Sequence, residues 1–478
     1  MKNILIAIRS IFKKGRHNVM KIVSLGIGLA VGLVLIAKVY FEQSYDDFYP
    51  DRDRVYQVWA KYQQNGGELK DYPQTSGGIA PTMQQQIPEI ETVTRYTSFG
   101  DWTFTMTDTK MKYSGRCIIA DSCFFDILPR PMLIGNAKEV LSTPMYVLIS
   151  SRIAKNIGGD VIGKNFTVDS SPGRTMTIGG VFEEVPENSH SRYDVIVSMA
   201  SAGRFMWEGS PTNMLGNDRY ISYVKLHKGV NPLALEEQVR TFVNSYFPPE
   251  EQQKTGFNIG FSFHELDGLH KELPQVKRMT WILSLLAFAL IFTAVMNYIL
   301  IVISSIVNRS KEVAVHKCYG ASENNIHGMM FGEALVHIVL SLILALLLIL
   351  AFRGTVEELL ATSLDSLLLS NGSLVLLGIC ILVFFVSGFM PGSLYARIPV
   401  ASAFRNYREN KRIWKKALLL VQFVATGFLV TMLVFVARQY TFMVNDRPGY
   451  AYENLAYCGL AGVDSTSRAK ILDEVMRL

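Results

Sequence analysis

Five long stretches without a charged residue constrain this chain more than any other feature of its sequence. They occupy residues 22–37, 280–307, 334–352, 373–395 and 417–437. A helix needs about 20 mainly apolar residues to cross a bilayer, and hydrocarbon offers the backbone no hydrogen-bond partner outside its own helix. Only 18% of the residues are charged, against about 25% in soluble domains. The sequence therefore predicts a membrane protein with an α-helical transmembrane bundle.

Basic residues predict the orientation of these helices, because Lys and Arg stay on the cytoplasmic side of a membrane. Six basic residues and no acidic one precede the first stretch: Lys2, Arg9, Lys13, Lys14, Arg16 and Lys21. Basic residues also dominate segments 308–325 and 397–416, whereas segment 353–372 is mainly acidic. The N-terminus is thus expected in the cytoplasm, and the long segment after the first stretch outside it. The net charge of +6 then reflects topology and not a nucleic-acid partner.

The first stretch is expected to remain in the protein as a span. A cleaved signal peptide is the alternative, but residues 37–41 offer no small-residue cleavage site. Gly28 and Gly32 have the spacing with which transmembrane helices pack closely. The chain is expected to consist of a cytoplasmic-face amphipathic helix at 1–18, spans at 19–41, 279–307, 329–352, 373–395 and 417–437, an exterior domain at 42–277, a cytoplasmic coupling segment at 308–326, a short exterior loop at 353–372, a basic linker at 396–416 and a last segment at 438–478.

The exterior domain has the mixed pattern of a large α+β fold. Alternating apolar residues predict strands, and apolar residues at helical spacing predict helices. The predicted strands are 54–59, 166–168, 175–181 and 193–199, and the predicted helices are 80–87, 152–157 and 233–246. A domain of this length could have one lobe or two.

One glycine-containing segment of this domain has phosphate-loop spacing. Gly158 and Gly163 are followed by Lys164, but Asn165 stands where a Ser or Thr would bind magnesium. The segment also follows a predicted helix and not a strand. A turn is expected.

Other reactive side chains do not form a recognisable site. His264 and His270 match no established zinc spacing, and Ser189-His190 lacks the signature of a nucleophile elbow. A disulfide between Cys117 and Cys123 remains open, because both lie in the predicted oxidising compartment. We expect no catalytic residue, no metal and no enzymatic activity.

The segment after the second apolar stretch carries the most specific signal. Residues 308–322 have the sequence NRSKEVAVHKCYGAS and resemble the R-x-K-E-I-G-I-R-K-x-L-G-A-S signature of FtsX/MacB-type ABC transporter permeases. Ala314 replaces the usual glycine, and His316 the usual arginine. Further stretches of the exterior domain resemble the MacB-like periplasmic core domain: 124–128, 133–135, 149–154, 161–164 and 179–190.

The resemblance implies a permease that couples ATP hydrolysis by a separate cytoplasmic ATPase to a conformational change of a periplasmic domain. In such permeases this segment is a coupling helix that docks on the ATPase. Val313 and Val315 are expected to contact a groove of that partner, while charges set the orientation. A solvated loop is the alternative. The expected ATPase-coupling residues are Arg309, Lys311, Glu312, Val313, Val315, His316, Lys317, Gly320, Ala321 and Ser322.

The resemblance also implies location, partners and output. The chain is expected in a bacterial inner membrane with an ATPase dimer, which would bind the ATP and Mg²⁺ because the chain itself binds no cofactor. A second permease unit, membrane lipids, and a membrane-fusion protein or periplasmic effector are the other expected partners. The expected output is efflux or extraction of a peptide, lipid or drug-like compound. The alternative is mechanotransmission that regulates a cell-wall hydrolase or sensor kinase.

The end of the chain resembles a repeat of its beginning. Residues 411–455 parallel residues 13–58 in order and character: basic residues, an apolar stretch, then aromatic and acidic residues. Permeases of this type exist in which the four-span unit occurs twice. Residues 438–478 are therefore expected to begin a second exterior domain that is truncated here, and an intact protein is expected to have about eight spans.

Overall fold

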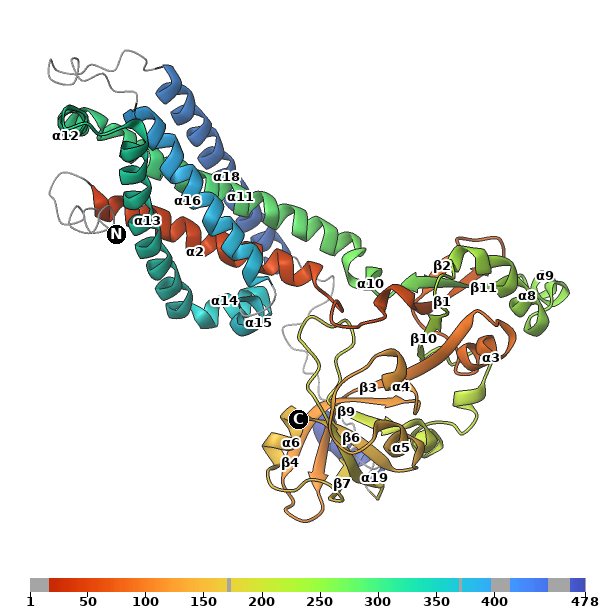
Figure 1. The fold of residues 1–478 in the computed structure, drawn as a ribbon. Helices are drawn as coiled ribbons and strands as arrows, with labels where there is room; N and C mark the ends of the chain where they lie inside the picture. Colours follow the sequence, from red (N-terminus) through yellow and green to blue (C-terminus); the bar gives the residue numbers. More distant parts are fainter. Residues whose placement is uncertain (1–16, 170–172, 369–371, 397–412, 446–464, 478) are drawn as a thin grey trace. The chain divides into compact units, whose positions relative to one another are not determined.

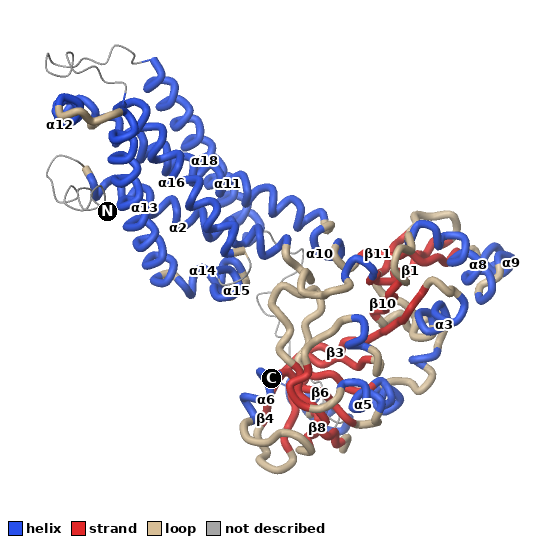
Figure 2. Tube along the Cα trace, viewed as in Figure 1, coloured by secondary structure: helices blue, strands red, loops and turns tan. Residues whose placement is uncertain are grey.

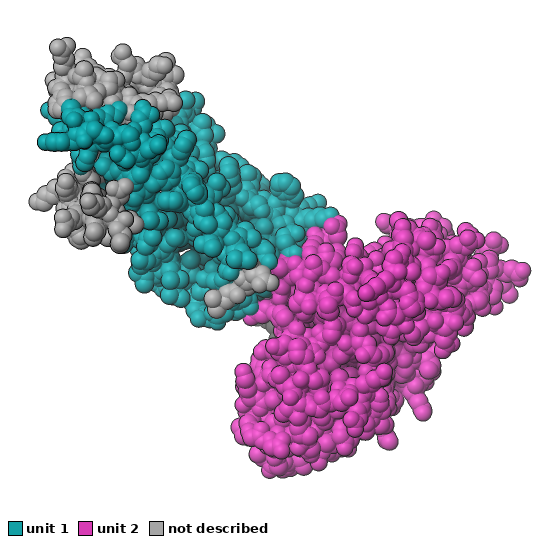
Figure 3. Space-filling model, viewed as in Figure 1, with its two compact units in different colours: residues 1–43, 274–452 teal, residues 44–273, 453–478 magenta. Residues whose placement is uncertain are grey.

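The chain folds into two compact units, which we describe separately (Figure 3). The computed structural model describes residues 17–169, 173–368, 372–396, 413–445 and 465–477. The membrane unit comprises residues 1–43 and 274–452, and the globular unit comprises residues 44–273 and 453–478. The amphipathic helix predicted at 1–18 and the basic linker predicted at 396–416 lie almost entirely outside the described residues.

Five helices in the described residues are long and apolar enough to cross a membrane (Figures 1 and 2). They are α2 (Asn18–Gln43), α11 (Pro274–Ser304), α13 (Glu323–Ala351), α16 (Ser373–Ala396) and α18 (Ile413–Asn445). Three shorter helices join them: α12 (Ile306–Cys318), α14 (Arg353–Leu360) and α15 (Leu364–Leu368). The last long helix extends eight residues past the predicted end of its span, since residues 438–445 contain no Gly or Pro that would end it.

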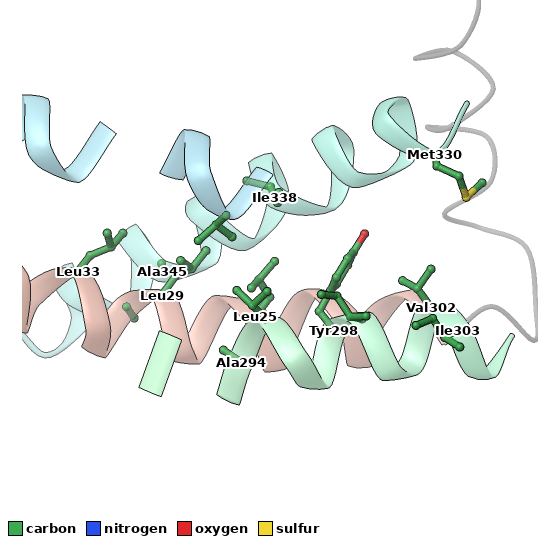
Figure 4. Close-up of a cluster of buried hydrophobic side chains, with 14 of the residues drawn as sticks. Leu25, Leu29, Leu33, Ala294, Tyr298, Val302, Ile303, Met330, Ile338 and Ala345 are labelled. Atoms are coloured by element: carbon green, nitrogen blue, oxygen red, sulfur yellow. The ribbon is translucent and has the colours of Figure 1, made fainter. Parts of the chain in front are cut away.

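Helix α2 lies at the centre of the packing in the membrane unit. It packs against both α11 and α13, and α13 packs in turn against α16. Leu25 and Leu29 of α2 are buried against side chains of α11 and α13, including Tyr298 and Ile338 (Figure 4). Two glycines allow the approach of α11, because a Cβ on Gly28 would lie 2.2 Å from the Cβ of Ala294, and one on Gly32 would lie 2.4 Å from Cγ1 of Ile291. Both glycines of the GxxxG spacing thus face the same neighbour.

The globular unit is built on one mixed sheet. In its described residues the sheet has eleven strands. Nine of them follow the order β11-β1-β10-β3-β4-β9-β6-β8-β5, while β2 pairs with β1, and β7 pairs with β3 and β8. The strands are β1 (Val55–Gln64), β2 (Lys70–Tyr72), β3 (Ile90–Met106), β4 (Lys112–Ala120), β5 (Met132–Ile134), β6 (Tyr146–Ser150), β7 (Asn165–Val168), β8 (Thr175–Phe182), β9 (Val195–Ser198), β10 (Ile221–Leu226) and β11 (Phe257–Glu265).

Helices cover this sheet, and the buried side chains of the unit form three hydrophobic clusters. One cluster lies under α3 and α8 and includes Val58 and Phe242; two others lie along β3, β4, β6 and β9. Because β3 pairs with β10 at one end and with β7 at the other, these regions belong to one compact unit. The helices are α3 (Ile79–Gln86), α4 (Phe124–Ile127), α5 (Ala137–Ser142), α6 (Ser151–Ile157), α7 (Ala202–Phe205), α8 (Glu236–Tyr246), α9 (Pro249–Thr255), α10 (Gly268–Lys271) and α19 (Ser465–Arg477), with 3₁₀ turns η1 (Arg52–Arg54), η2 (Met199–Ser201), η3 (Ser210–Thr212) and η4 (Pro232–Leu235).

The expected fold class is confirmed: a bundle of long apolar helices accompanies a large α+β domain. The segment with phosphate-loop spacing is a turn between α6 and β7, in which Gly158 and Gly163 have positive φ of 74° and 76°. Such backbone favours glycine because a Cβ would be strained there. Cys117 and Cys123 are both free thiols. Of the predicted start of a second exterior domain at 438–478, residues 446–464 lie outside the described residues.

Candidate coupling site

The signature found at residues 308–322 folds as helix α12 and the turn that follows it. Ser305 separates α12 from α11, and Gly320 ends it with a φ of 85°. The N–H of Gly320 donates to the carbonyl of Lys317 at 3.0 Å, and the N–H of Ala321 donates to that of His316 at 3.0 Å. This pair of bonds is a Schellman motif, which satisfies the last carbonyls of a helix. The hydroxyl of Ser322 then accepts from the N–H of Asn325 and begins α13.

One face of α12 is buried against the membrane unit. Ser310, Val313 and Ala314 are no more than 2% exposed, and their spacing of three and four residues places them on the same side of the helix. Val313 and Ala314 belong to the same hydrophobic cluster as Val302 of α11 and Met330 of α13. The helix is therefore anchored to the transmembrane helices by its own side chains, and the alternative of a solvated loop is wrong.

The opposite face of α12 is exposed. Lys311, Val315 and His316 point away from the membrane unit, and Val315 is 43% exposed. Glu312 and Lys317 are half-buried at the sides of the helix. The side chain of Arg309 lies outside the described residues. Val315, an apolar residue between charged residues, is thus exposed on a helix whose opposite face packs against the membrane unit.

The prediction for Val313 is wrong. Its side chain is 1% exposed, because helical spacing turns it toward the membrane unit, two residues away from the exposed Val315. Gly320, Ala321 and Ser322 shape the turn into α13. Only some of the ten predicted residues are therefore exposed and able to contact a partner.

Tyr319 was not predicted as a site residue, although it lies inside the signature. It is the C-cap of α12 and is 89% exposed. An exposed tyrosine beside a predicted interface is notable, because tyrosine is enriched among the residues that dominate binding energy. Its position at the end of the helix, beyond the buried face, could have indicated that its side chain is exposed.

The globular unit contains a buried polar network in which Asp46 is central. Asp46 accepts from the hydroxyl of Ser189 at 2.9 Å and contacts Nδ1 of His190 at 2.7 Å. Nε2 of His190 contacts the hydroxyl of Tyr223. Burial raises the pKa of Tyr223 well above its usual value, so this hydroxyl stays protonated and can donate to His190.

This network differs from a Ser-His-Asp triad in its connections. A triad serine bonds to histidine, whose second nitrogen bonds to aspartate. Here Ser189 bonds to Asp46 instead, is 3% exposed, and has no access to a substrate. The three residues therefore hold residues 44–49 to the loop at 186–193, as does the 2.9 Å bond from the N–H of Asp46 to the carbonyl of Asn188.

Within the globular unit, charged residues join the segment that follows α2 to the segment that precedes α11. Lys271 pairs with Asp47 at 3.0 Å and with Asp267 at 2.8 Å, and Arg52 pairs with the same two aspartates. The ring of His270 stacks on that of Tyr45 at 3.5 Å, while His264 stacks on Trp59. These histidines therefore make aromatic contacts. Within the described residues no group of three or more His, Cys, Asp or Glu side chains could hold a metal ion.

Two family models match the chain one after the other. The model of the MacB-like periplasmic core domain matches residues 20–242, and the model of the FtsX-like permease C-terminal region matches residues 284–400. The first covers most of the globular unit with α2, and the second covers α12 with most of α11, α13 and α16.

The chain belongs to the FtsX/MacB-type ABC transporter permeases.

Three solved structures show what this permease is similar to. A domain of a permease protein from Porphyromonas gingivalis is 33% identical, with 45% of this chain and 91% of that chain covered and a TM-score of 0.42. The periplasmic region of MacB from Actinobacillus actinomycetemcomitans is 16% identical, with 43% and 87% covered and a TM-score of 0.29. The extracellular domain of the noncanonic ABC-type transporter YknZ from Gram-positive bacteria is 11% identical, with 43% and 98% covered and a TM-score of 0.31. No curated protein matches the chain.

The transmembrane helices of this permease are joined by polar contacts. Nζ of Lys21 in α2 lies 3.4 Å from Oε1 of Glu333 in α13, and both side chains are buried. Asn297 of α11 donates to the hydroxyl of Ser24 in α2 at 2.6 Å. His337 contacts the hydroxyl of Tyr298 at 3.2 Å. Each contact links two helices, so these groups help to hold the bundle together.

Proposed function

We propose that the chain is the membrane subunit of an ABC system and docks on a separate cytoplasmic ATPase through α12. The observation that supports this most is the division of α12 into two faces. Its buried face is fixed to α11 and α13, while Val315 and Tyr319 remain exposed. A partner that binds the exposed face would therefore move transmembrane helices when it moves.

The proposed topology follows from the charges of the sequence. The N-terminus and α12 lie on the cytoplasmic side of a bacterial inner membrane, and the globular unit lies in the periplasm. An ATPase dimer binds the ATP and Mg²⁺, and needs a second permease unit or a second permease half as its other docking partner. Hydrolysis drives a change of the globular unit that serves efflux or extraction of a peptide, lipid or drug-like compound.

Mechanotransmission is the second candidate output. The contacts of Asp47 and Lys271 favour it, because they join the segment that follows α2 to the segment that precedes α11. Because these segments are joined, movement of α2 or α11 would displace both of them together and with them the sheet. That displacement would control a cell-wall hydrolase or a sensor kinase without a transported solute. A membrane-fusion protein or a periplasmic effector would bind the globular unit and respond to that movement.

Docking is tested by co-purification of the full chain with ABC ATPases co-expressed from the same genome. Val315→Glu and Tyr319→Ala should each reduce recovery of the ATPase about tenfold, as expected for central interface residues. Charge reversal of Glu312 together with Lys317 should also reduce it. Trp207→Ala, an exposed aromatic residue of the globular unit, is the matched control. Full recovery with both α12 variants would disprove docking through this face.

Transport and mechanotransmission differ in what stimulates the reconstituted complex. Substrate-dependent ATPase activity with loss of that substrate from vesicles supports transport. ATP-dependent activation of a bound hydrolase, with no solute moved, supports mechanotransmission.

A further inference from the structure

An open cavity of about 810 Å³ lies at one end of the sheet in the globular unit. Its wall is aromatic because of strand register. Ala60 of β1 pairs with Tyr72 of β2, and Gln64 of β1 pairs with Phe257 of β11. Tyr62 lies between these pairs on the same face, since side chains two residues apart in a strand share a face. The three rings form a cluster, with centroids 5.5 Å apart for Tyr62 and Tyr72 and 5.3 Å apart for Tyr62 and Phe257.

These rings are not used to fill the hydrophobic core. Tyr72 is 43% exposed, and Tyr62 and Phe257 are half-buried. The hydrophobic cluster under α3 and α8 ends before them. Aromatic faces left open in a cavity carry negative electrostatic potential and attract cations.

Two carboxylates line the same cavity. Asp218 accepts from the hydroxyl of Tyr62 at 2.6 Å and from Ser76, and both donors are neutral. Burial and this bond to Asp218 raise the pKa of Tyr62, so its hydroxyl remains a donor. Glu68 is exposed. Within the described residues neither carboxylate forms an ion pair, so their negative charges are not neutralised.

Lys70 is the one basic side chain among the residues that line this cavity. It is exposed, and its long stem lets the ammonium group extend into solvent. Two acidic residues against one basic residue leave the lining with a negative balance.

We propose that this cavity binds a small organic cation, an amine or quaternary ammonium group on an apolar body. The apolar body would stack on Tyr62, Tyr72 and Phe257, and the cationic group would lie between the rings and the carboxylates of Glu68 and Asp218. This inference deepens the proposed transport function, and rests on it only for the role of the ligand. The cavity is formed by the globular unit alone, so binding requires no ATPase.

The test uses the full chain in neutral detergent without ATPase, and saturation-transfer NMR with benzyltrimethylammonium as the probe. Phenylacetate, which has a similar ring and the opposite charge, is the comparison ligand. Protein-dependent binding of the cation and little binding of phenylacetate are expected, with detergent micelles alone as the background. Equal binding of both ligands, or no binding of the cation, would overturn the proposal while leaving docking of the ATPase untouched.

Variants separate this cavity from general attraction of cations. Glu68→Gln and Asp218→Asn should each weaken binding of the cation about twofold to fivefold, as expected for a carboxylate at a partly exposed site. Lys70→Gln should strengthen it, because a repelling charge is removed. Asp101→Asn, at an exposed acidic residue of β3, should change nothing. Glu68 makes no side-chain bond in the described residues, so unchanged affinity of a folded Glu68→Gln variant contradicts the proposal even if Asp218→Asn fails to fold.

Discussion

Lys21 and Glu333 place opposite charges between two apolar helices, where neither could remain ionised alone. Their side chains are 0% and 8% exposed, so contacts with protein groups replace contacts with water. Lys21, for example, also donates to the side chain of Asn18. A buried pair of this kind contributes little net stability, but removal of one partner leaves an uncompensated charge. The pair therefore constrains how α2 and α13 fit together.

This asymmetry gives a prediction for single and double variants. Glu333→Leu should destabilise the purified chain by about 3–5 kcal/mol, because Lys21 is left buried without its carboxylate. The double variant Lys21→Met/Glu333→Leu should recover most of this loss. Thermal unfolding in detergent, followed by circular dichroism, measures both. A double variant less stable than Glu333→Leu alone would show that the pair is net stabilising.

The cysteines give a second prediction at the residue scale. Cys117 is 0% exposed, and burial raises the pKa of its thiol well above the usual value. Cys318 at the end of α12 is exposed. Because thiolate is the reactive form and must be accessible, iodoacetamide at pH 8 should modify Cys318 and leave Cys117 unmodified until the chain is unfolded. Peptide mass spectrometry distinguishes the two sites, and early modification of Cys117 would contradict the burial of β4.

At the scale of elements, contact between α2 and α11 depends on small residues. Gly28→Leu would direct a side chain into Ala294, where even a Cβ has no room. Overpacking of this kind costs about 1–3 kcal/mol, and we expect a lower unfolding temperature in detergent. Gly378→Leu in α16 is the matched control, since nothing lies within 4 Å of a Cβ at that position. Similar losses in both variants would mean that leucine is unfavourable for another reason.

Elements with a strong sequence pattern were predicted well. The apolar stretches became long helices, and the strands predicted at 166–168 and 175–181 became β7 and β8. Helix α3 was predicted within one residue of its bounds because Pro88 follows it. In these segments local sequence and tertiary structure favour the same conformation.

Elements that depend on distant partners were missed. β6 is buried on both faces and therefore lacks the alternation that identifies a strand. In β3 the pairing shifts between Ser98 and Gly100, and such a bulge interrupts the pattern. The inward orientation of Val313 could not be predicted either, because the sequence shows that α12 is amphipathic but not which helices cover its apolar face.

For the whole molecule, the polar network around Asp46 lies where the chain first enters the globular unit. Asp46 is fully buried and contacts Ser189, His190 and the backbone of Asn188. Ser189 and His190 lie 143 and 144 positions away in the sequence, in the loop between β8 and β9. Displacement of the segment after α2 must therefore either move the loop at 186–193 with it or break these bonds.

This argument predicts that loss of the network uncouples the globular unit from the ATPase without preventing assembly. His190→Leu leaves Asp46 without its histidine partner, at a cost of about 1–3 kcal/mol for a buried unsatisfied group, and should loosen residues 44–49. In the complex with its ATPase, ATP-dependent changes in hydrogen exchange of the globular unit should fall by about half or more, while recovery of the ATPase stays unchanged. His227→Leu, at an exposed histidine after β10, should keep the full response. A full ATP response in a folded His190→Leu complex would mean that motion reaches the sheet by another route, and the ionic contacts of Lys271 with Asp47 and Asp267 would then be the next to test.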